Sequence, residues 1–169
     1  MEWDALSAPD RRLRSMSLQF VDHRRGSASK YSWVPPFDWS VDFENDHWWD
    51  ELTYHSVSEP WFVQVMEDGI EVARVEFDDP GRINPKYVGV PKLGGERLKI
   101  QLIEVAADAT RRGIGTRVVE GLAKLHHGRR LFAYSQDADE FWSSLGWQRF
   151  DHRDGQPQFH RALFIQPDP

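Results

Sequence analysis

The stretch "ATRRGIGTR" (Ala109–Arg117) places two glycines and three arginines where a strand pattern gives way to a helix pattern. The first turn of a helix leaves backbone N–H groups without intrahelical partners, and these groups carry the positive end of the helix dipole. Gly113 and Gly115 leave room for an anion to approach that backbone, and Arg111 and Arg112 add positive charge. The stretch therefore predicts a phosphate or pyrophosphate site. The alternative is that the glycines only let the helix pack close to the sheet.

Apolar periodicity on both sides of this corner indicates the elements that form it. Upstream, Arg97–Ala107 alternates as a strand does, with a change of face that indicates a bulge near Leu102. Downstream, Thr116–Gly128 ends at a glycine, the usual helix stop. Its apolar stripe consists of Val118, Val119, Leu122 and Leu125. A short strand, Arg130–Ser135, and a short helix, Asp137–Gly146, follow.

The rest of the chain adds a hairpin and several further elements. Trp61–Asp79 alternates apolar residues around Asp68-Gly69, a pair typical of tight hairpin turns, and changes face near Ala73. The other expected elements are a first strand at 15–23, a helix at 43–55, a long connection at 80–96 and closing strands at 147–152 and 160–165. Short turns imply antiparallel pairing, and the two late strand–helix–strand crossings imply parallel pairing. The expected fold class is α+β, a mixed sheet with helices on both faces.

Length and composition predict one domain with a sizeable core. The chain has 169 residues, no cysteine and a net charge of -6. It therefore needs no disulfides and lacks the basic balance that nucleic-acid binding requires. No apolar run approaches the roughly 20 residues of a membrane span, and the N-terminus has no hydrophobic signal core. We therefore expect a cytoplasmic protein that binds neither nucleic acid nor a membrane.

Charge is distributed unevenly along the chain. Asp38–Glu59 contains seven acidic residues and neither lysine nor arginine, whereas Arg111–Arg130 contains six basic residues and one acidic residue. The acidic, tryptophan-rich segment 37–61 combines carboxylates with aromatic rings, which suits a cationic substrate. The alternatives are that the segment docks a protein partner, or that its rings belong to the core. The rings concerned are Trp48, Trp49 and Trp61.

Two linked motifs resemble those of a known family. Thr110-Arg111-Arg112-Gly113-Ile114-Gly115 is similar to the Gln/Arg-x-x-Gly-x-Gly/Ala loop of the GNAT superfamily of N-acetyltransferases. Phe141–Trp147 is similar to the family's terminal aromatic-aromatic-x-x-x-Gly-aromatic motif, and the match extends over residues 98–150. The resemblance implies a GNAT-like acyl-CoA N-acyltransferase fold with a mostly antiparallel, twisted sheet. It implies a single domain over 1–169, with a variable acceptor-side region at 1–60, an acetyl-CoA-binding core at 61–150 and a closing strand at 151–169.

The resemblance also implies acetyl-CoA as the cofactor and indicates which residues hold it. The backbone of the glycine-containing loop would bind the pyrophosphate, and the edge of the strand near Glu104 would pair with the pantetheine arm where that strand splays from the next. The implied cofactor-binding residues are Val105, Ala107, Arg111, Arg112, Gly113, Ile114, Gly115, Thr116, Ser135, Phe141 and Trp142. Thr110 departs from the family's Gln or Arg, and Ser135 stands where many members have Asn.

Acetyl transfer to an amine also requires a base and an acid. A primary amine with a pKa of about 10.4 is almost fully protonated at pH 7, so a carboxylate or a water chain must remove a proton. The candidate bases are Glu104, Glu76 and, more weakly, Glu71, each of which is otherwise a solvent-facing strand carboxylate. Glu104 is preferred because its strand lines the expected cofactor site. Trp142 stands where many members have a tyrosine acid, which leaves Tyr134 as the candidate acid or, alternatively, as a core ring.

These features predict an acetyl-CoA-dependent N-acetyltransferase that acts on a primary amine of a small molecule, peptide or protein by direct attack on the thioester. The alternative is a non-catalytic GNAT-fold module that binds an acyl-CoA as a sensor or interaction module. No metal is expected, and His126-His127 at a helix end are interpreted as offsetting the helix dipole. A homodimer is possible.

Overall fold

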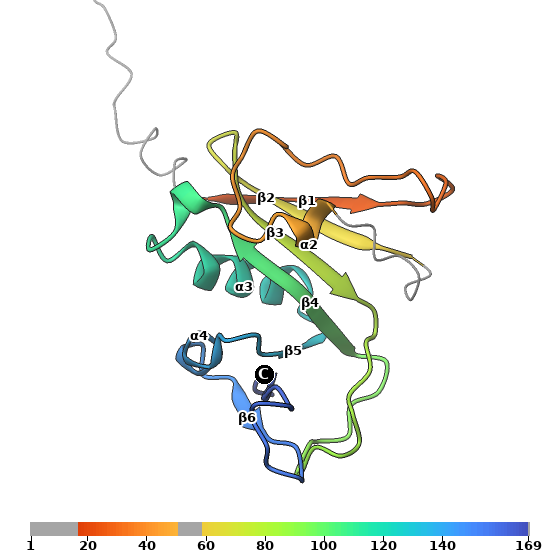
Figure 1. Cartoon of the computed structure of the whole chain (residues 1–169), viewed down its shortest axis with the longest axis vertical. Helices are drawn as coiled ribbons and strands as arrows, with labels where there is room; N and C mark the ends of the chain where they lie inside the picture. The colour runs from red at the N-terminus through yellow and green to blue at the C-terminus, as the bar shows by residue number, and fades with distance from the viewer. Residues whose placement is uncertain (1–16, 51–58, 169) are drawn as a thin grey trace, which may run out of the picture.

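The computed structural model describes residues 17–50 and 59–168, whose strands form one mixed sheet (Figure 1). The seven strands lie in the order β1-β2-β3-β4-β5-β7-β6. Their bounds are β1 Leu18–Arg24, β2 Trp61–Glu67, β3 Ile70–Asp78, β4 Arg97–Val105, β5 Arg130–Tyr134, β6 Gln148–Phe150 and β7 Leu163–Ile165. Neighbouring strands are antiparallel except for β4 and β5, so the predicted α+β class is confirmed.

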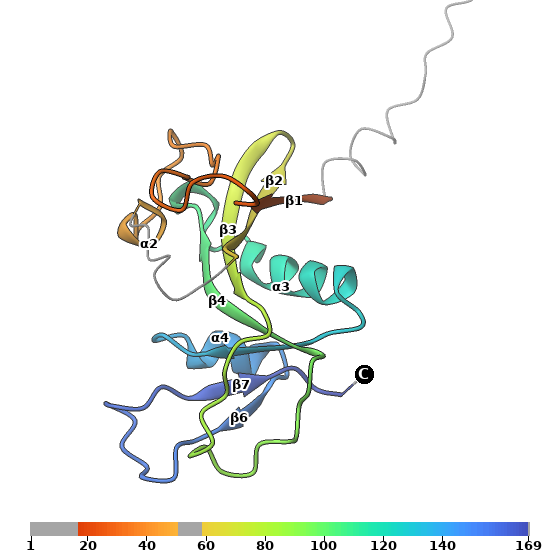
Figure 2. The ribbon, with the colours of Figure 1, turned by 90° about the vertical axis from the view of Figure 1, so that its right-hand side faces the viewer.

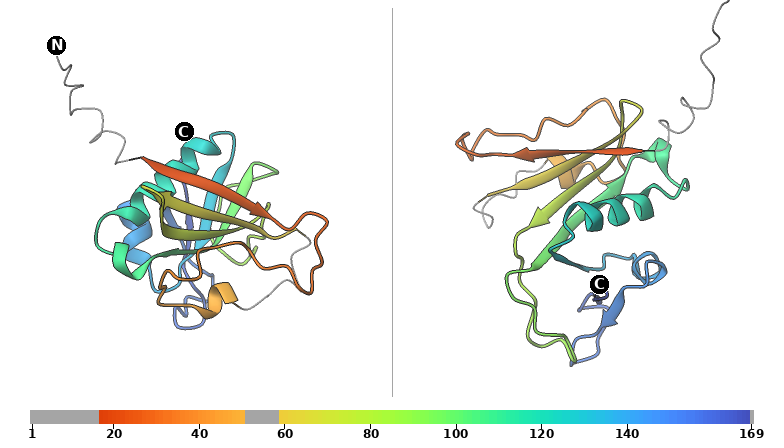
Figure 3. Two further views of the ribbon diagram at one scale, coloured as in Figure 1. Left: turned by 90° about the horizontal axis from the view of Figure 1, so that it is seen from above. Right: turned by 180° about the vertical axis from the view of Figure 1, so that it is seen from behind.

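Helices lie on both faces of this sheet (Figure 2). The elements are α2 (His47–Asp50), α3 (Ile114–Leu125), α4 (Asp139–Ser144) and a short 3-10 turn, Ala107–Ala109. From behind, α3 crosses β3 and β4 (Figure 3). Of the helix predicted at 43–55, the structure shows His47–Asp50, while 51–58 lie outside the described residues. None of the helices in 17–50 and 59–168 has the length and apolar character to cross a membrane.

Both predicted changes of face are confirmed as irregularities in the strand pairing. The register between β2 and β3 shifts after Val65 and leaves Val72 as the extra residue of β3. The register between β3 and β4 shifts before Phe77 and leaves Gln101 as the extra residue of β4. A bulge re-aims the side chains that follow it, so the Gln101 bulge changes what β4 presents to β5.

One strand pairing predicted from the sequence is wrong. The crossing from β5 through α4 to β6 does not produce a parallel pair, because β7 lies between β5 and β6 and is antiparallel to both. All three residues of β7, Leu163–Ile165, are buried, whereas Gln148 and Arg149 of β6 are exposed. The more apolar strand therefore takes the inner position, where both of its faces are covered, and β6 becomes the edge.

The C-terminal end of α3 also differs from expectation. Val118, Val119 and Leu122 are buried as predicted, but Leu125 is 58% exposed. The next residue, His126, lies at 5.2 Å from the ring of Trp61 and 5.5 Å from that of Phe77. Burial lowers the pKa of His126 below its ordinary value, so this ring is neutral at pH 7 and does not offset the helix dipole.

Candidate functional site

The parallel strands β4 and β5 separate after three residue pairs (Figure 1). Arg97, Leu98 and Lys99 pair with residues 130–132, but β4 continues to Val105 with no strand partner on that side within the described chain. A cavity of about 370 Å³ occupies the opening and is lined by β4, the start of α3, the end of β5 and α4. The splay that the resemblance implied is therefore present, and it leaves backbone N–H and C=O groups of β4 exposed to a ligand.

The start of α3 forms one end of this cavity. Gly113 is the N-cap residue with a φ of 70°, and no side chain caps the free N–H groups of the first turn. A Cβ at Gly113 would meet no atom within 4 Å, whereas a Cβ at Gly115 would lie 3.2 Å from the Phe141 ring. The two glycines thus have different roles: Gly113 permits the left-handed turn and leaves the helix end open, and Gly115 permits α4 to approach α3.

The arginines of this corner also divide into two groups. Arg112 and Arg117 both bind the carboxylate of Glu67 at the end of β2, at 2.5 and 2.7 Å. The hydrogen bond from Arg117 is the main reason that the pKa of Glu67 lies below its ordinary value. Arg111 has a φ of 63° and lines the cavity. Among the three arginines of residues 109–117, Arg111 is thus the one that lines the opening.

The cavity is lined by most of the residues that the resemblance implied as cofactor-binding residues. They are Val105, Arg111, Gly113, Ile114, Gly115, Thr116, Phe141 and Trp142. Ala107, Arg112 and Ser135 are not among the lining residues. The strand ends before Ala107, whose N–H donates to the carbonyl of Asp42, and the Ser135 hydroxyl accepts the N–H of Ala138.

The lining residues that were not predicted from the sequence as cofactor contacts include Trp48, Gln101, Gln136 and Ala138. The change of face near Leu102 was the signal for Gln101, because it marked the bulge. The sequence marked Trp48 as part of the tryptophan-rich segment that suits a cationic substrate and not as a cofactor contact, because α2 reaches the cavity only through the packing of segment 37–49 on the sheet.

Comparison with solved structures agrees with this geometry. A bacterial toxin superposes with a TM-score of 0.55 and 11% sequence identity over 88% of this chain and 89% of that chain. The protein has a GNAT-like fold. An acetyltransferase from Thermus thermophilus matches at a TM-score of 0.47 and 20% identity, over 64% of each chain. A GNAT family acetyltransferase from Elizabethkingia anophelis with acetyl-CoA bound matches at 0.48 and 13%, over 89% of this chain and 98% of that one. No family model and no curated protein matches the sequence.

Within the GNAT-like fold, Glu104 lies beside the cavity but is held by three hydrogen bonds. Its Oε2 accepts the backbone N–H of Asn45 at 2.9 Å and the side-chain amide of Asn45 at 2.8 Å. Its Oε1 accepts the indole N–H of Trp49 at 2.8 Å. Glu104 is 8% exposed, and these donors anchor the start of α2 on β4. The structure therefore gives this carboxylate a clear part in positioning Trp48 and Trp49.

Glu76 has a different environment on the neighbouring strand. It is 7% exposed and pairs across the sheet with Leu102, which lines the cavity. Burial, and to a smaller extent the charge of Asp78, raises the pKa of Glu76 to about 7. Within residues 17–50 and 59–168, no group donates a hydrogen bond to the carboxylate of Glu76. A carboxyl group that titrates near neutral pH is suited to accept a proton in catalysis.

Tyr134 lies at the end of β5, where the cavity meets a second one. Its hydroxyl oxygen accepts the N–H of Asn84 at 2.8 Å, so the hydroxyl proton remains available for donation. The long connection between β3 and β4 therefore reaches the edge of the site. Burial raises the pKa of Tyr134, which keeps the phenol protonated at neutral pH.

The acidic, tryptophan-rich segment mainly contributes to the core. Trp49 and Trp61 are 1% and 4% exposed, as the core interpretation predicted, while Trp48 is half-buried at the cavity. Beneath the segment, Arg74 and Glu71 form a buried ion pair at 2.5 Å, and Arg74 donates to the carbonyl of Asp38. Through its ion pair with Arg74, Glu71 thus helps to hold this segment on the sheet.

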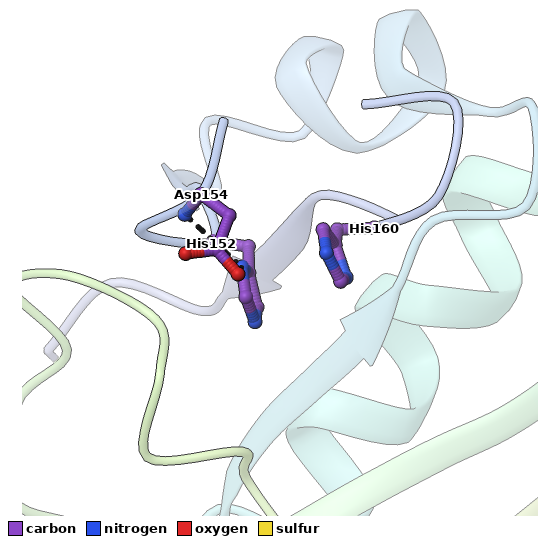
Figure 4. Close-up of side chains that lie close together, drawn as sticks. All are labelled: His152, Asp154 and His160. Carbon is purple, nitrogen blue, oxygen red and sulfur yellow. Dashed lines mark hydrogen bonds and ion pairs between the residues drawn. The ribbon is translucent and has the colours of Figure 1, made fainter. Parts of the chain in front are cut away.

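A group of potential metal ligands lies in the loop between β6 and β7 (Figure 4). It consists of His152, Asp154 and His160. The two imidazole rings are stacked with centroids 3.6 Å apart and planes 9° apart, and Nδ1 of His152 accepts the N–H of Asp154 at 3.2 Å. An ion in the plane of one stacked ring cannot also lie in the plane of the other, where that ring's lone pair points. This arrangement packs the loop and does not converge on an ion.

Proposed function

We propose that the protein is an N-acetyltransferase that transfers an acetyl group from acetyl-CoA to a primary amine. The observation that carries this proposal is the cavity between the diverging strands β4 and β5, with the open N-terminus of α3 at one end. Such an opening places two kinds of binding group next to each other. The unpaired edge of β4 suits a chain of amide groups, and the helix end with Arg111 suits a diphosphate.

The residues present fit the parts of coenzyme A. From Val105 to Gln101, the free edge of β4 extends about 13 Å at about 3.3 Å per residue, as suits an extended arm. Ile114, Phe141 and Trp142 provide apolar walls along it. Acetyl-CoA would supply the activated acetyl group at the Gln101 end of this path, where Tyr134 also lies.

The chemical step requires proton acceptance on one side of the thioester and proton donation on the other. The acceptor would enter as the neutral amine, after its ammonium group has released one proton to solvent. Its nitrogen would then form a bond to the acetyl carbon while the carbon–sulfur bond breaks, and it would lose a second proton as the sulfur gains one. Glu76 accepts the proton, directly or through water, because it is the carboxyl group near the site whose pKa is raised to about 7. Tyr134 provides the proton for the sulfur. Glu104 acts as a positioning residue through Asn45 and Trp49.

The alternative is a module that binds an acyl-CoA without turnover. Trp142 in place of the family's tyrosine and the three hydrogen bonds to Glu104 favour this alternative. Release of free thiol from acetyl-CoA in the presence of a panel of amines distinguishes the two functions. Binding of coenzyme A without release across the panel would support the module and contradict the transferase.

Calorimetric titration with coenzyme A tests the site that both functions share. Gly113→Glu places a carboxylate at the open helix end, where charge-assisted hydrogen bonds to the diphosphate should form, and should weaken binding by about 10- to 100-fold. Gly26→Glu, in the loop after β1, is the matched control and should leave the Kd unchanged, since Gly26 is also left-handed, with a φ of 56°, and a Cβ there also meets no atom within 4 Å. Equal affinity of both variants would contradict the assignment.

A further inference from the structure

A second cavity of about 300 Å³ adjoins the first at the end of β5. Gln101 and Tyr134 line both cavities, so they form the wall that the two share. The last β4–β5 pair is Lys99 with Phe132, so the shared wall, two residues further along each strand, lies where β4 and β5 begin to separate. The start of α3 lines the first cavity only. The second cavity is therefore separate from the expected phosphate end.

The second cavity is lined by positive and aromatic side chains. Lys99, His160 and Arg161 contribute basic groups, and Tyr87 and Phe159 contribute rings. No carboxylate is among the lining residues. Within the described part of the chain, neither Lys99 nor Arg161 forms an ion pair within 4.0 Å.

The side chains of Lys99 and Arg161 both line the second cavity. Burial lowers the pKa of Lys99, Asp78 and Glu76 partly oppose that effect, and the charge of Arg161 adds to it. The charge of Arg161 thus acts on Lys99, with a smaller effect than the charges of Asp78 and Glu76. The hydroxyl of Tyr87 holds the backbone of Arg161 by a hydrogen bond of 2.6 Å, which fixes the base of its side chain at the cavity. An anion between the two cations would relieve their repulsion.

We infer that this cavity binds a carboxylate on the acceptor, so that the substrate is an amine that also carries an acid group. The inference rests on the proposed acetyl transfer. Lys99 and Arg161 bind the carboxylate, and Phe159, which is 74% exposed, covers the apolar part of the substrate at the entrance. The amine then reaches the shared wall at Gln101 and Tyr134, beside the thioester. Arg161 acts on binding of the acceptor and not on the chemical step, whereas the charge of Lys99 also lowers the pKa of Glu76.

Matched acceptors that differ only at the acid group test this assignment. Thiol release is measured with 4-aminobutyrate, 6-aminohexanoate and Nα-acetyl-lysine, each against its carboxamide, because the distant amine has nearly the same basicity in both members of a pair. We expect the acid member of at least one pair to have a kcat/KM about 10-fold or more above that of its amide, the range for hydrogen bonds to a charged group. The difference should lie in KM.

Substitutions connect that preference to the cavity. Lys99→Met and Arg161→Met should each raise the KM of the preferred acid about 10-fold while leaving the Kd for coenzyme A unchanged. Arg161→Met should also leave kcat unchanged, whereas Lys99→Met removes a charge that lowers the pKa of Glu76 and should change kcat as well. Lys124→Met, on the exposed side of α3, is the matched control. Release without preference for the acid, or a preference that both cavity variants retain, would overturn the inference and leave the transferase proposal standing. Coenzyme A binding without release from any pair would contradict both.

Discussion

Replacing Glu76 with glutamine should stabilise the protein in a pH-dependent way and reduce its activity. The pKa of Glu76 rises from an ordinary value of 4.5 to about 7 on folding, because the carboxyl group is buried. The folded state therefore retains a proton that the unfolded chain has released, and stability falls as the pH rises from about 4.5 to about 7. At about 1.36 kcal/mol per pH unit, ionisation of Glu76 costs the folded wild type about 3 kcal/mol above pH 7.

Urea denaturation of the wild type and of Glu76→Gln, at about pH 4.5 and at pH 8, measures this cost. Glutamine does not ionise, so the stability of the variant relative to the wild type should rise by about 3 kcal/mol between the two pH values. The same change corresponds to roughly 6–12 °C in Tm for a domain of this size. Glu120→Gln, at an exposed position on α3, is the matched control and should show no such change. A constant difference between Glu76→Gln and wild type would refute the raised pKa.

Activity provides a second measurement on the same variant. If Glu76 accepts the amine proton, wild-type kcat/KM rises with pH through about 7, because the carboxylate form is the active one. Glu76→Gln should lower kcat about 100-fold or more and remove that inflection. A variant that keeps both the rate and the inflection would exclude Glu76 as the base.

Three further substitutions test contacts that the fold provides. Tyr134→Phe should lower kcat about 100-fold because it removes the donated proton, and equal rates would exclude Tyr134 as the acid. It also removes the acceptor of the Asn84 N–H, but the Kd for coenzyme A should be unchanged because the start of α3 is not altered. Arg74→Met should cost about 3–5 kcal/mol in urea denaturation because it leaves Glu71 buried and unpaired, and adding Glu71→Gln should recover part of this loss. Trp49→Phe should cost about 1–3 kcal/mol by removing a donor from Glu104, and a smaller loss would mean that water replaces the indole.

Local sequence patterns were sufficient to predict most of the helices and strands, and also the β4 wall of the cavity. The Asp68-Gly69 turn has φ values of 52° and 78°, as the residue pair predicts. The apolar period marked α3, and the changes of face marked both bulges, including the one that places Gln101 at the site. These features depend on neighbours within a few residues, which is why they can be predicted without knowing the fold.

The sequence by itself thus determined where strands and helices form and that a glycine-marked helix end follows β4. Only the tertiary structure decided what the charged side chains do. Arg112 binds Glu67, 45 residues away, and Glu104 binds Trp49, 55 residues away, so neither is a free group at the cavity. The burial that raises the pKa of Glu76 likewise depends on what covers the sheet. Partner choice and burial are set by which elements become neighbours in space, and a local pattern contains no information about that.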